Sequence, residues 1–598
     1  MRYAILAEIY RKLDATQKRL EMIDILIELF DKTELENIRI VIYLTSGKIG
    51  ADFEDLDIGI AEKMVIKAIA KAVGKSEEIV TALFAKKGDL GEVVEAFKAK
   101  STQQGLEAFL TDGKTAAEES LTVREVWETL NKIANLEGKG SAAKKINTLV
   151  GLYAKATPLE AKYITRTVLS QLRLGVRDLT IIEALARKYC TEKDARKVIE
   201  HAYNVTSDIG FVGEILARKG LEAVRQIKIQ VGRPIRMMAA QRLPSTEEIL
   251  EKLGGKCALE FKYDGERVQA HKNGDKITLF SRNLNDISTM YPDVRDALKA
   301  SITASKAIVE GEIVAWDPQA ERLRPFQILM SRKRKYDISE MKEKIPVKVF
   351  LFDLLFVDGD NYLLKAYPQR RTKLEEIIKE EEIITLASQE IVTNASEFEA
   401  FFETAIESGC EGVMAKDIRE TAIYQAGNRG FLWIKHKFDY SSAFADSYDF
   451  VVVGGFYGKG RRKGMLGTLL MAAYNPEKEI FETVCKLGSG FSDEDLAKIT
   501  KELMALRTPE KPKEVASKLE ADVWFYPTKV FEIRGADLST SPVHTCALNE
   551  IKEDMGIAIR FPRFIRFRED KKPEFATTTK EIIDAYKEQR LLKKEKKN

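Results

Sequence analysis

With 598 residues, 44% of them hydrophobic and 32% charged, the chain is long enough for roughly three to five globular domains. Its formal net charge of +3 excludes a protein that binds nucleic acid through overall charge, so any such contact must come from local basic patches. Neither an apolar run of ~18 residues nor a signal-peptide layout after Met1 is present, which predicts a cytoplasmic protein without a membrane partner.

Cysteines and histidines argue against two further kinds of site. The five cysteines are scattered and include no Cys-x-x-Cys pair, which argues against structural zinc and against a secreted disulfide framework. The four histidines include no His-x-x-x-His spacing, so a histidine-based metal site is not expected.

Residues 1–232 predict an all-helical domain. Apolar residues recur there at spacings of three and four, as at Ile23, Leu26 and Phe30, and strand-type alternation is scarce. We therefore expect a packed helical domain at the start of the chain.

Two arginines late in this helical region are candidates for phosphate contacts. Arg173 and Arg177 flank Gly175 where a helical pattern ends. A turn of this kind can bring backbone amides and guanidinium groups onto phosphates. A solvated helix end explains the same residues equally well.

A second stretch of the helical region has the spacing of a docking peptide. Gln103 is followed by Leu106 at the third position and by Phe109 and Leu110 at the sixth and seventh. Such a turn can fill a hydrophobic pocket on a partner, and it resembles the peptide with which replication proteins hold the sliding clamp. Packing inside an ordinary helix accounts for these residues as well.

From residue 233 to 443 the chain predicts a mixed α/β domain, because a Gly and a Pro at 232 and 234 end the helical pattern. Strand alternation puts Glu260, Lys262 and Asp264 on one face. Asn273 and Gly274 predict a hairpin.

If Asn273 and Gly274 form the whole hairpin loop, residue 272 pairs with residue 275. Counting back from that pair sets Phe280 opposite Arg267 and Arg282 opposite residue 265. Two arginines then lie at the same end of the hairpin as Lys262.

Lys262 is the candidate for covalent chemistry. A free lysine amine is protonated at neutral pH and cannot attack an electrophile. Desolvation and neighbouring cations lower its pKa, which is how lysine becomes a nucleophile. The competing interpretation is a surface ladder of ion pairs, since Lys-x-Asp-Gly arises by chance in on the order of one such chain in ten.

Charged strand ends elsewhere in this domain point to phosphate and metal. Lys435 and Lys437 lie two residues apart on a predicted strand, where they repel each other unless an anion lies between them. Glu312 and Glu411, on two other predicted strands, could hold Mg²⁺ through carboxylate oxygens and waters. The apolar run 347–356 predicts a central strand.

Residues 444–598 predict strands, turns and a final helix from Thr579 onward. Lys459, Arg461 and Arg462 lie among glycines between two predicted strands, in a loop suited to a phosphodiester backbone. Small β-barrels of this kind often bind nucleic acid.

Taken in order, several stretches resemble the motifs of the covalent nucleotidyltransferases and, more closely, of the ATP-dependent DNA ligases of archaea and eukaryotes. The resemblance covers essentially the whole chain. The stretches are residues 262–267, 280–283, 310–312, 352–355, 411–416, 433–437 and 568–571.

The resemblance implies a multidomain fold: an all-α DNA-binding domain (1–232), an α/β (α+β) nucleotidyltransferase or adenylation domain with antiparallel sheets (233–443), and an OB-fold β-barrel with a C-terminal helix (444–598). It further implies ATP and Mg²⁺ as cofactors and nicked duplex DNA as substrate. A monomer, a nucleoid-associated location and binding to the sliding clamp are also expected.

Residue roles follow from the same resemblance. Lys262 corresponds to the nucleophile that becomes lysyl-AMP, Glu260 to the acid that contacts adenine, and Phe352 to the ring stacked on the base. Other residues match ribose and phosphate contacts or, at the end of the chain, the groups that orient pyrophosphate. These are Arg267, Arg282, Glu312, Arg429, Lys435 and Lys437, followed by Arg568 and Lys571.

The sequence departs from the family pattern at His436, where an aliphatic residue is commoner, and at Leu110 in the clamp peptide. RNA ligases and RNA-capping guanylyltransferases share the lysine motif, but the long helical front domain favours duplex DNA. NAD is disfavoured as adenylate donor because no four-cysteine zinc module is present. A non-catalytic, clamp-associated scaffold is the alternative from another class.

Overall fold

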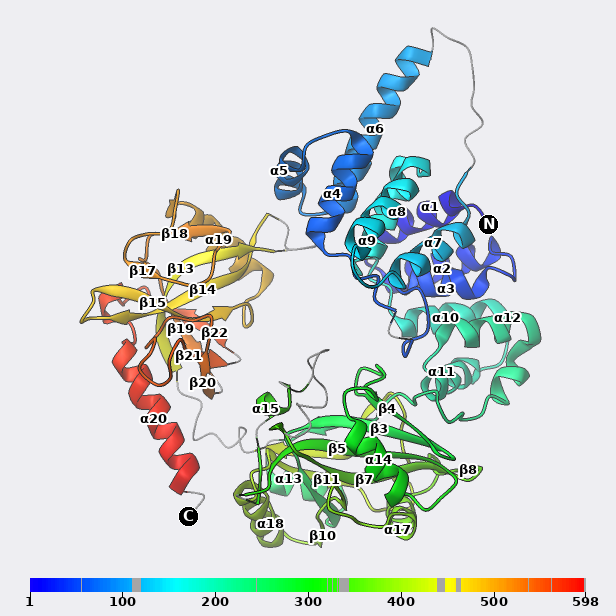
Figure 1. Ribbon diagram of the computed structural model, residues 1–598, viewed down its shortest axis with the longest axis vertical. Coiled ribbons are helices and arrows are strands. Elements are labelled where there is room, and N and C mark those ends of the chain that lie inside the picture. The colour runs from blue at the N-terminus through cyan, green and yellow to red at the C-terminus, as the bar shows by residue number, and fades with distance from the viewer. Residues whose placement is uncertain are drawn as a thin grey trace. The chain divides into compact units, whose positions relative to one another are not determined.

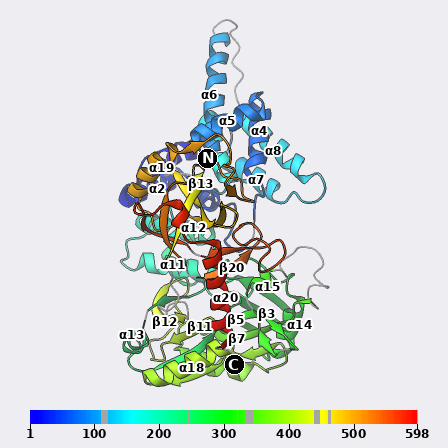
Figure 2. The same cartoon turned by 90° about the vertical axis from the view of Figure 1, so that its left-hand side faces the viewer.

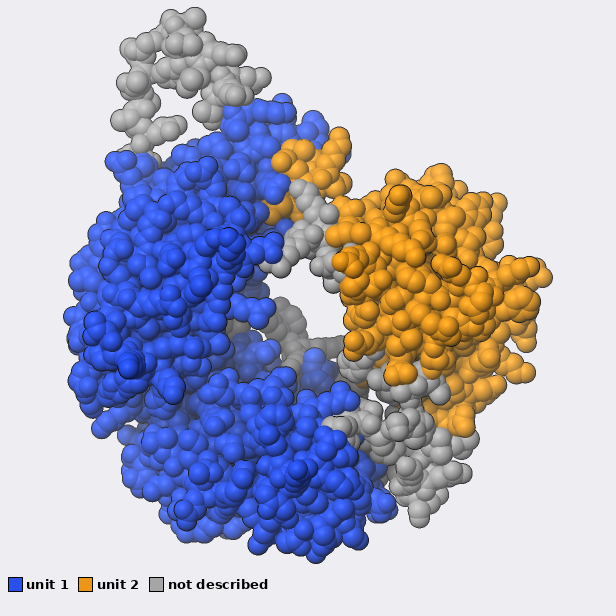
Figure 3. Space-filling model, turned by 180° about the vertical axis from the view of Figure 1, so that it is seen from behind, with its two compact units in different colours: residues 1–81, 90–438 blue, residues 82–89, 439–598 orange. Residues whose placement is uncertain are grey.

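The computed structural model describes residues 1–54, 56–109, 120–243, 245–319, 321–324, 326–330, 332, 344–437, 447–458, 464–535, 537–560 and 562–595. The chain forms two compact units, residues 1–81 with 90–438 and residues 82–89 with 439–598 (Figure 3). Across these described ranges, no helix combines the length and apolar character needed to span a bilayer.

The first part of the first unit is helical, as its apolar spacing predicts (Figure 1, blue to teal). Helices that are distant in sequence pack in pairs, such as the third on the twelfth and the sixth on the ninth. The helices are α1 (Tyr3–Asp14), α2 (Arg19–Asp31), α3 (Ile38–Thr45), α4 (Glu62–Val73), α5 (Glu77–Lys87), α6 (Leu90–Phe109), α7 (Val123–Ala134), α8 (Ser141–Lys155), α9 (Pro158–Val168), α10 (Asp178–Tyr189), α11 (Ala195–Thr206) and α12 (Ile209–Arg225).

The second part of the first unit contains two β-sheets, which confirms the predicted mixed domain (Figure 1, green). One sheet has the strand order β1 (Ala239–Arg242), β12 (Arg429–Lys437), β11 (Gly412–Lys416), β2 (Cys257–Lys262) and β10 (Gln389–Val392). The other has the order β4 (Lys276–Ser281), β3 (Glu266–Asn273), β5 (Lys306–Asp317), β7 (Val347–Val357) and β8 (Asp360–Asn361), with β6 (Arg322–Leu323) on β5 and β9 (Ile384–Leu386) on β7.

Helices cover these sheets and close their apolar cores. Val294 and Leu298 of α14, and Tyr291 directly before it, share one buried cluster with strand residues of the second sheet. Figure 2 shows α14 beside β3 of that sheet. The helix α18 packs on β2 and β11 of the first sheet. The helices of this part are α13 (Thr246–Lys252), α14 (Pro292–Ser301), α15 (Phe326–Met330), α17 (Tyr367–Ile377) and α18 (Ala395–Glu407).

The predicted face shared by Glu260, Lys262 and Asp264 needs a correction. The strand β2 ends at Lys262, and the chain then crosses to the other sheet, where β3 begins at Glu266. Gly265 permits this crossing, because a Cβ there would meet the carbonyl oxygen of Ile313 at 2.3 Å. Asp264 therefore lies in the crossing and not on the strand.

The predicted hairpin register is also wrong by two residues. Asn273 pairs with Lys276, and Phe280 consequently lies opposite Gln269 instead of Arg267. The loop begins at Gly274, whose φ of 59° is in the left-handed region that glycine adopts without strain. Sequence alternation does not reveal which of two turn residues takes this conformation.

The second unit is rich in antiparallel strands (Figure 1, yellow to red). Its larger sheet has the order β16 (Arg507–Thr508), β18 (Val523–Phe525), β13 (Ser447–Tyr457), β14 (Leu466–Asn475), β15 (Ile480–Leu487) and β17 (Val515–Ala516), and β19 (Val530–Arg534) joins β13 to β22 (Arg563–Phe567). The strands β20 (Asp537–Ser541) and β21 (Gly556–Arg560) pair separately, and the helices are α19 (Asp493–Met504) and α20 (Thr579–Glu595).

The predicted sheet-rich C-terminal part and its final helix are thus confirmed. Among the residues that the structure describes in this unit, the strand pairs do not close into a ring. The OB-type barrel therefore stays a prediction.

Candidate active site

A cavity of about 580 Å³ lies between the two sheets of the first unit. Its wall includes every site residue that the sequence predicts for nucleotide or metal in this unit. These residues are Glu260, Lys262, Arg267, Arg282, Glu312, Phe352, Glu411, Arg429, Lys435 and Lys437.

Lys262 lies in this cavity as the last residue of β2, opposite Gly412 of β11. Its Nζ is 2.5 Å from the carboxylate of Glu411, and Nζ of Lys437 is 2.6 Å from the same oxygen. Burial alone would raise the pKa of Glu411, but Lys262 and Lys437 outweigh it and hold this pKa below its ordinary value. One carboxylate thus bridges the candidate nucleophile and one predicted phosphate lysine.

Asp264 is the second acid beside Lys262. Its carboxylate accepts a hydrogen bond from the backbone amide of Phe326 at 3.1 Å. Burial raises the pKa of Asp264, and the neighbouring charge of Glu411 raises it further. Asp264 therefore binds a proton more readily than an exposed aspartate.

Three cations of the cavity wall have no carboxylate partner in the described part of the chain: Arg282, Arg429 and Lys435. Burial lowers the pKa of Lys435, and the cations Lys437, Lys262, Arg429 and Arg282 lower it further. Uncompensated cations in one cavity attract an anion with several charges, such as a polyphosphate.

A buried acid with an aromatic wall occupies another part of the cavity. Glu260 is fully buried and pairs with Nζ of Lys416 at 2.6 Å. That ammonium group lies 4.9 Å from the ring centre of Phe352 and 4.6 Å from that of Trp433. The hydroxyl of Tyr367 donates a hydrogen bond to Glu260. An acid beside flat apolar walls suits a purine base, which stacks and also donates hydrogen bonds.

Two buried groups hold the guanidinium group of Arg267 in place. Its guanidinium donates to Glu310 at 2.8 Å and to the carbonyl oxygen of Met238 at 2.7 Å. It lies 5.5 Å from the ring centre of Phe352 and 5.3 Å from that of Trp433. The side chain therefore supports the aromatic wall as well as lining the cavity.

Glu312 provides the test of whether the cavity suits Mg²⁺. Burial raises the pKa of Glu312 to about 7, against the opposing charges of Lys262 and Arg267. A divalent cation would favour its ionised form, so Glu312 together with Glu411 fits the one or two carboxylates by which proteins hold Mg²⁺ beside substrate phosphates. Within the described residues, no three His, Cys, Asp or Glu side chains gather closely enough to hold a metal ion by themselves.

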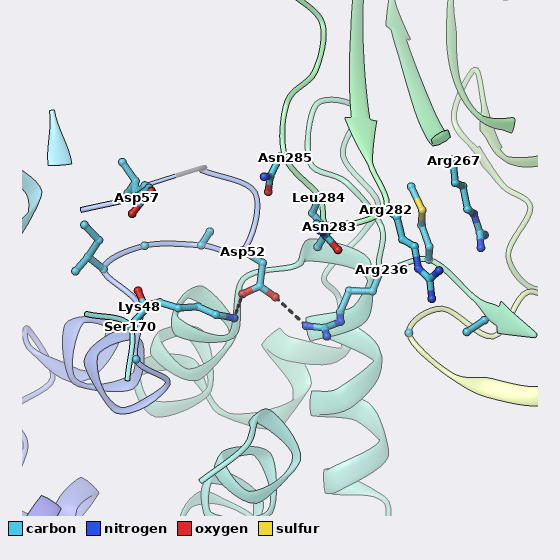
Figure 4. Close-up of a pocket in the computed structure, with 18 of the residues that line it drawn as sticks. Lys48, Asp52, Asp57, Ser170, Arg236, Arg267, Arg282, Asn283, Leu284 and Asn285 are labelled. Carbon is cyan, nitrogen blue, oxygen red and sulfur yellow. Dashed lines mark hydrogen bonds and ion pairs between the residues drawn. The ribbon is translucent and has the colours of Figure 1, made fainter. Parts of the chain in front are cut away.

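A neighbouring cavity of about 600 Å³ in the same unit shares Ala239, Arg267, Arg282, Asn283 and Asn285 with the first. Figure 4 shows Asp52 in its wall, bound on one side to Lys48 and on the other to Arg236. The pair of Asp52 with Arg236 connects the helical part of the unit to the segment that leads into β1. Arg282 therefore faces two cavities.

The last two predicted nucleotide residues, Arg568 and Lys571, belong to the second unit. Both bind one oxygen of Asp449, Arg568 at 2.7 Å and Lys571 at 2.6 Å. Arg568 also forms an ion pair with Asp570 at 2.8 Å.

The arginines predicted to contact DNA lie between α9 and α10. Arg177 is exposed directly before α10, and Arg173, with a φ of 58°, donates to Gln171 at 2.6 Å. The segment is irregular and is anchored by buried Leu172 and Leu174, so it is not a simple helix end.

Other predicted contacts fall outside what the structure describes. Lys459, Arg461, Arg462 and Leu110 lie outside the described residues. Gln103, Leu106 and Phe109 lie in α6, but their side chains are not among the described ones.

Sequence reasoning assigned no role to three residues that shape the site. Lys416 and Tyr367 hold Glu260, and Glu310 holds Arg267. Tyr367 is 107 residues from Glu260 in the chain, so no local pattern could have paired them. Lys416 and Glu310 stood in predicted strands, where their charge inside an apolar pattern was the available signal.

Comparisons with known proteins agree with this geometry. The chain matches the family models DNA ligase N terminus over residues 2–186, ATP dependent DNA ligase domain over residues 237–437 and ATP dependent DNA ligase C terminal region over residues 462–571. It is 50% identical to DNA ligase 2 of Thermofilum pendens, over 98% of each chain. It is 49% identical to the DNA ligase of Hyperthermus butylicus, over 100% of this chain and 99% of that one.

A solved structure named Pmar-Lig_PreS3 has a TM-score of 0.55 against this chain, with 18% identity. The superposition covers 94% of this chain and 99% of the other. At that identity the likeness concerns the fold alone.

Proposed function

The chain belongs to the ATP-dependent DNA ligase family, and from this premise we propose that Lys262 is the residue on which the protein carries adenylate. The activity itself is the ATP-driven sealing of nicks in duplex DNA, with ATP and Mg²⁺ as cofactors. The observation that carries the proposal is the cavity that Lys262 shares with three cations for which the described residues provide no carboxylate partner.

In the first step, Nζ of Lys262 attacks the α-phosphorus of ATP. An N–P bond forms, the bond to the bridging oxygen breaks, and pyrophosphate leaves. Arg282, Arg429 and Lys435 bind the phosphate oxygens, because they are the cations of the wall that no carboxylate of the described residues neutralises. Glu260 and Phe352 hold the base.

The amine must lose a proton before it attacks. Glu411 contacts Nζ directly, but its lowered pKa makes it a weak proton acceptor. Asp264, whose pKa is raised, is the stronger acceptor beside it. We propose that the proton leaves through these two acids and that Glu411 remains as the counter-ion of Lys437.

Glu312 and Glu411 would hold Mg²⁺, and the bound ion would neutralise phosphate charge during the transfer. In the later steps, adenylate passes from Lys262 to the 5′-phosphate of the nick, and the 3′-hydroxyl displaces it. Arg568 and Lys571 of the second unit act in the first step only, on the leaving pyrophosphate.

We keep the domain limits of 1–232, 233–443 and 444–598 as a proposal, together with a monomeric state, DNA contacts by Arg173 and Arg177, and a nucleoid-associated cytoplasmic location. Binding to the sliding clamp through residues 103–110 is also proposed. An unchanged clamp affinity of Phe109→Ala would remove it.

Incubation with α-labelled ATP and Mg²⁺ tests the proposal. Wild-type protein should take up label, and Lys262→Ala should take up none, because the variant lacks the amine to which the proposal assigns the attack. Lys276→Ala, a lysine of β4 outside the cavity, is the control and should label normally. Full labelling of Lys262→Ala would show that the nucleophile is elsewhere.

A further inference from the structure

Asp449 is a buried acid of the second unit with a fixed position. It lies in β13, opposite Glu532 of β19, and is 8% exposed. Its backbone amide donates to Oγ1 of Thr577 at 2.9 Å, and the backbone amide of Thr577 donates to its carbonyl oxygen at 2.8 Å. Two hydrogen bonds therefore fix the stretch of backbone from which the carboxylate projects.

One oxygen of this carboxylate holds two cations. Oδ2 accepts from Nη1 of Arg568 at 2.7 Å and from Nζ of Lys571 at 2.6 Å. Two cations this close repel each other strongly unless a negative charge lies between them. Asp449 supplies that charge. Arg568 is also held by Asp570 at 2.8 Å, whereas Asp449 is the only carboxylate that binds Lys571 in the described part of the chain, so without it Lys571 would turn away from Arg568.

The second oxygen of the carboxylate, Oδ1, is buried and has no hydrogen-bond partner in the described part of the chain. A buried charged oxygen left unpaired is costly and calls for a reason. The reason here is that the carboxylate is turned so that Oδ2 meets both cations at once. Two N–H donors that converge on one oxygen form the arrangement that also binds a phosphate oxygen.

We infer that Asp449 is a positioning residue, which keeps Arg568 and Lys571 converged on one point so that they can receive the leaving pyrophosphate as a pair. Asp449 itself does not touch the nucleotide. This inference rests on the proposed role of Arg568 and Lys571 in the first step and extends it to the residue that orients them.

The test is Asp449→Asn in the full-length protein, which keeps the size of the side chain and removes its charge. Self-adenylation should slow by ~10- to 100-fold, the loss expected when reacting groups are misplaced by about an ångström. Sealing of a nick that already carries adenylate should stay within about twofold of wild type, because that step releases no pyrophosphate.

Glu502→Gln is the matched control, since Glu502 of the same unit also pairs with two lysines, Lys529 at 3.0 Å and Lys498 at 4.0 Å. The rate of self-adenylation and the rate of sealing a nick that already carries adenylate should both be unchanged in this variant. A merely structural role of Asp449 would impair both steps of Asp449→Asn together, and that result would overturn the inference. Unchanged or faster self-adenylation would also overturn it.

A double-mutant cycle separates positioning from a loss of folding, because a folding defect of Asp449→Asn would cost the same in both backgrounds. In a Lys571→Met background only one cation remains, so removing the charge of Asp449 should cost self-adenylation less than it does in wild type. Equal losses in both backgrounds would contradict the inference. If wild-type protein itself formed no adenylate, the proposed function would fail instead, so the two failures can be distinguished.

Discussion

Glu312 is an acid of the cavity whose charge changes near neutral pH. Burial raises its pKa from an ordinary 4.5 to about 7. The folded protein therefore holds this proton more tightly than the unfolded chain does, and stability falls as pH rises from about 4.5 to about 7. Above that window the folded state carries the full cost of a buried charge.

Glu312→Gln should remove this pH dependence, because glutamine keeps the shape and never ionises. Melting temperatures of the nucleotide-free and metal-free protein should be similar for both forms near pH 4, and the variant should be the more stable at pH 8. The difference corresponds to on the order of 1 to 3 kcal/mol. A difference that is constant across pH would show that Glu312 does not titrate in this range.

The crossing from β2 to β3 is the element that brings the nucleophile to the cavity. Lys262 ends one sheet and Arg267 belongs to the next, and Gly265 between them lies against the backbone of β5. An added Cβ would stand 2.3 Å from the carbonyl oxygen of Ile313 and 2.9 Å from Cγ of Glu312. Backbone atoms cannot move aside as a flexible side chain can, so the strands would have to separate.

Gly265→Ala should therefore lower the melting temperature and reduce self-adenylation by at least ~10-fold, since a small misplacement of reacting groups has an effect of that size. Gly274→Ala at the hairpin loop is the control. Its φ of 59° makes alanine unfavourable by ~1 kcal/mol, but open space surrounds it and the cavity is not involved. Normal adenylation by Gly265→Ala would show that the crossing tolerates the added atom.

A residue of the site could be predicted from the sequence where the strand that carries it has a recognisable pattern of its own. The strands that hold Glu312, Phe352 and Lys435 follow from alternation or apolar runs, and all three residues line the cavity. The partners of functional residues could not be predicted, because Asp449 lies 119 residues before Arg568 in the chain. Such pairs are created by sheet register, which local patterns do not specify.

At the scale of the molecule, the segment 227–236 connects the helical part to the nucleotide-binding part. The backbone amide of Gly232 donates to Nδ1 of His271 at 3.0 Å, and the amide of Ile235 donates to Gln269 at 2.7 Å. Burial lowers the pKa of His271 to about 3, so the ring stays neutral and can accept this bond. The side-chain amide of Gln269 in turn donates a hydrogen bond at 3.1 Å to Glu310, the carboxylate that also binds Arg267.

A fragment of residues 227–598 should thus fold and adenylate itself at a rate close to that of the whole protein, while losing most nick sealing. A fragment of residues 237–598 should melt at a lower temperature and adenylate more slowly, because it leaves His271 and Gln269 buried without their partners. Equal melting temperatures and equal adenylation rates of the two fragments would show that the segment 227–236 contributes nothing to the cavity.

The most direct test of the account is to locate the adenylate. Protein incubated with ATP and Mg²⁺ is digested, and its peptides are compared by mass spectrometry with those of protein kept without nucleotide. We expect one adenylate per chain, on the peptide that contains Lys262 and on the side-chain nitrogen of that lysine. Adenylate on any other residue, or none at all while nick sealing proceeds, would contradict it.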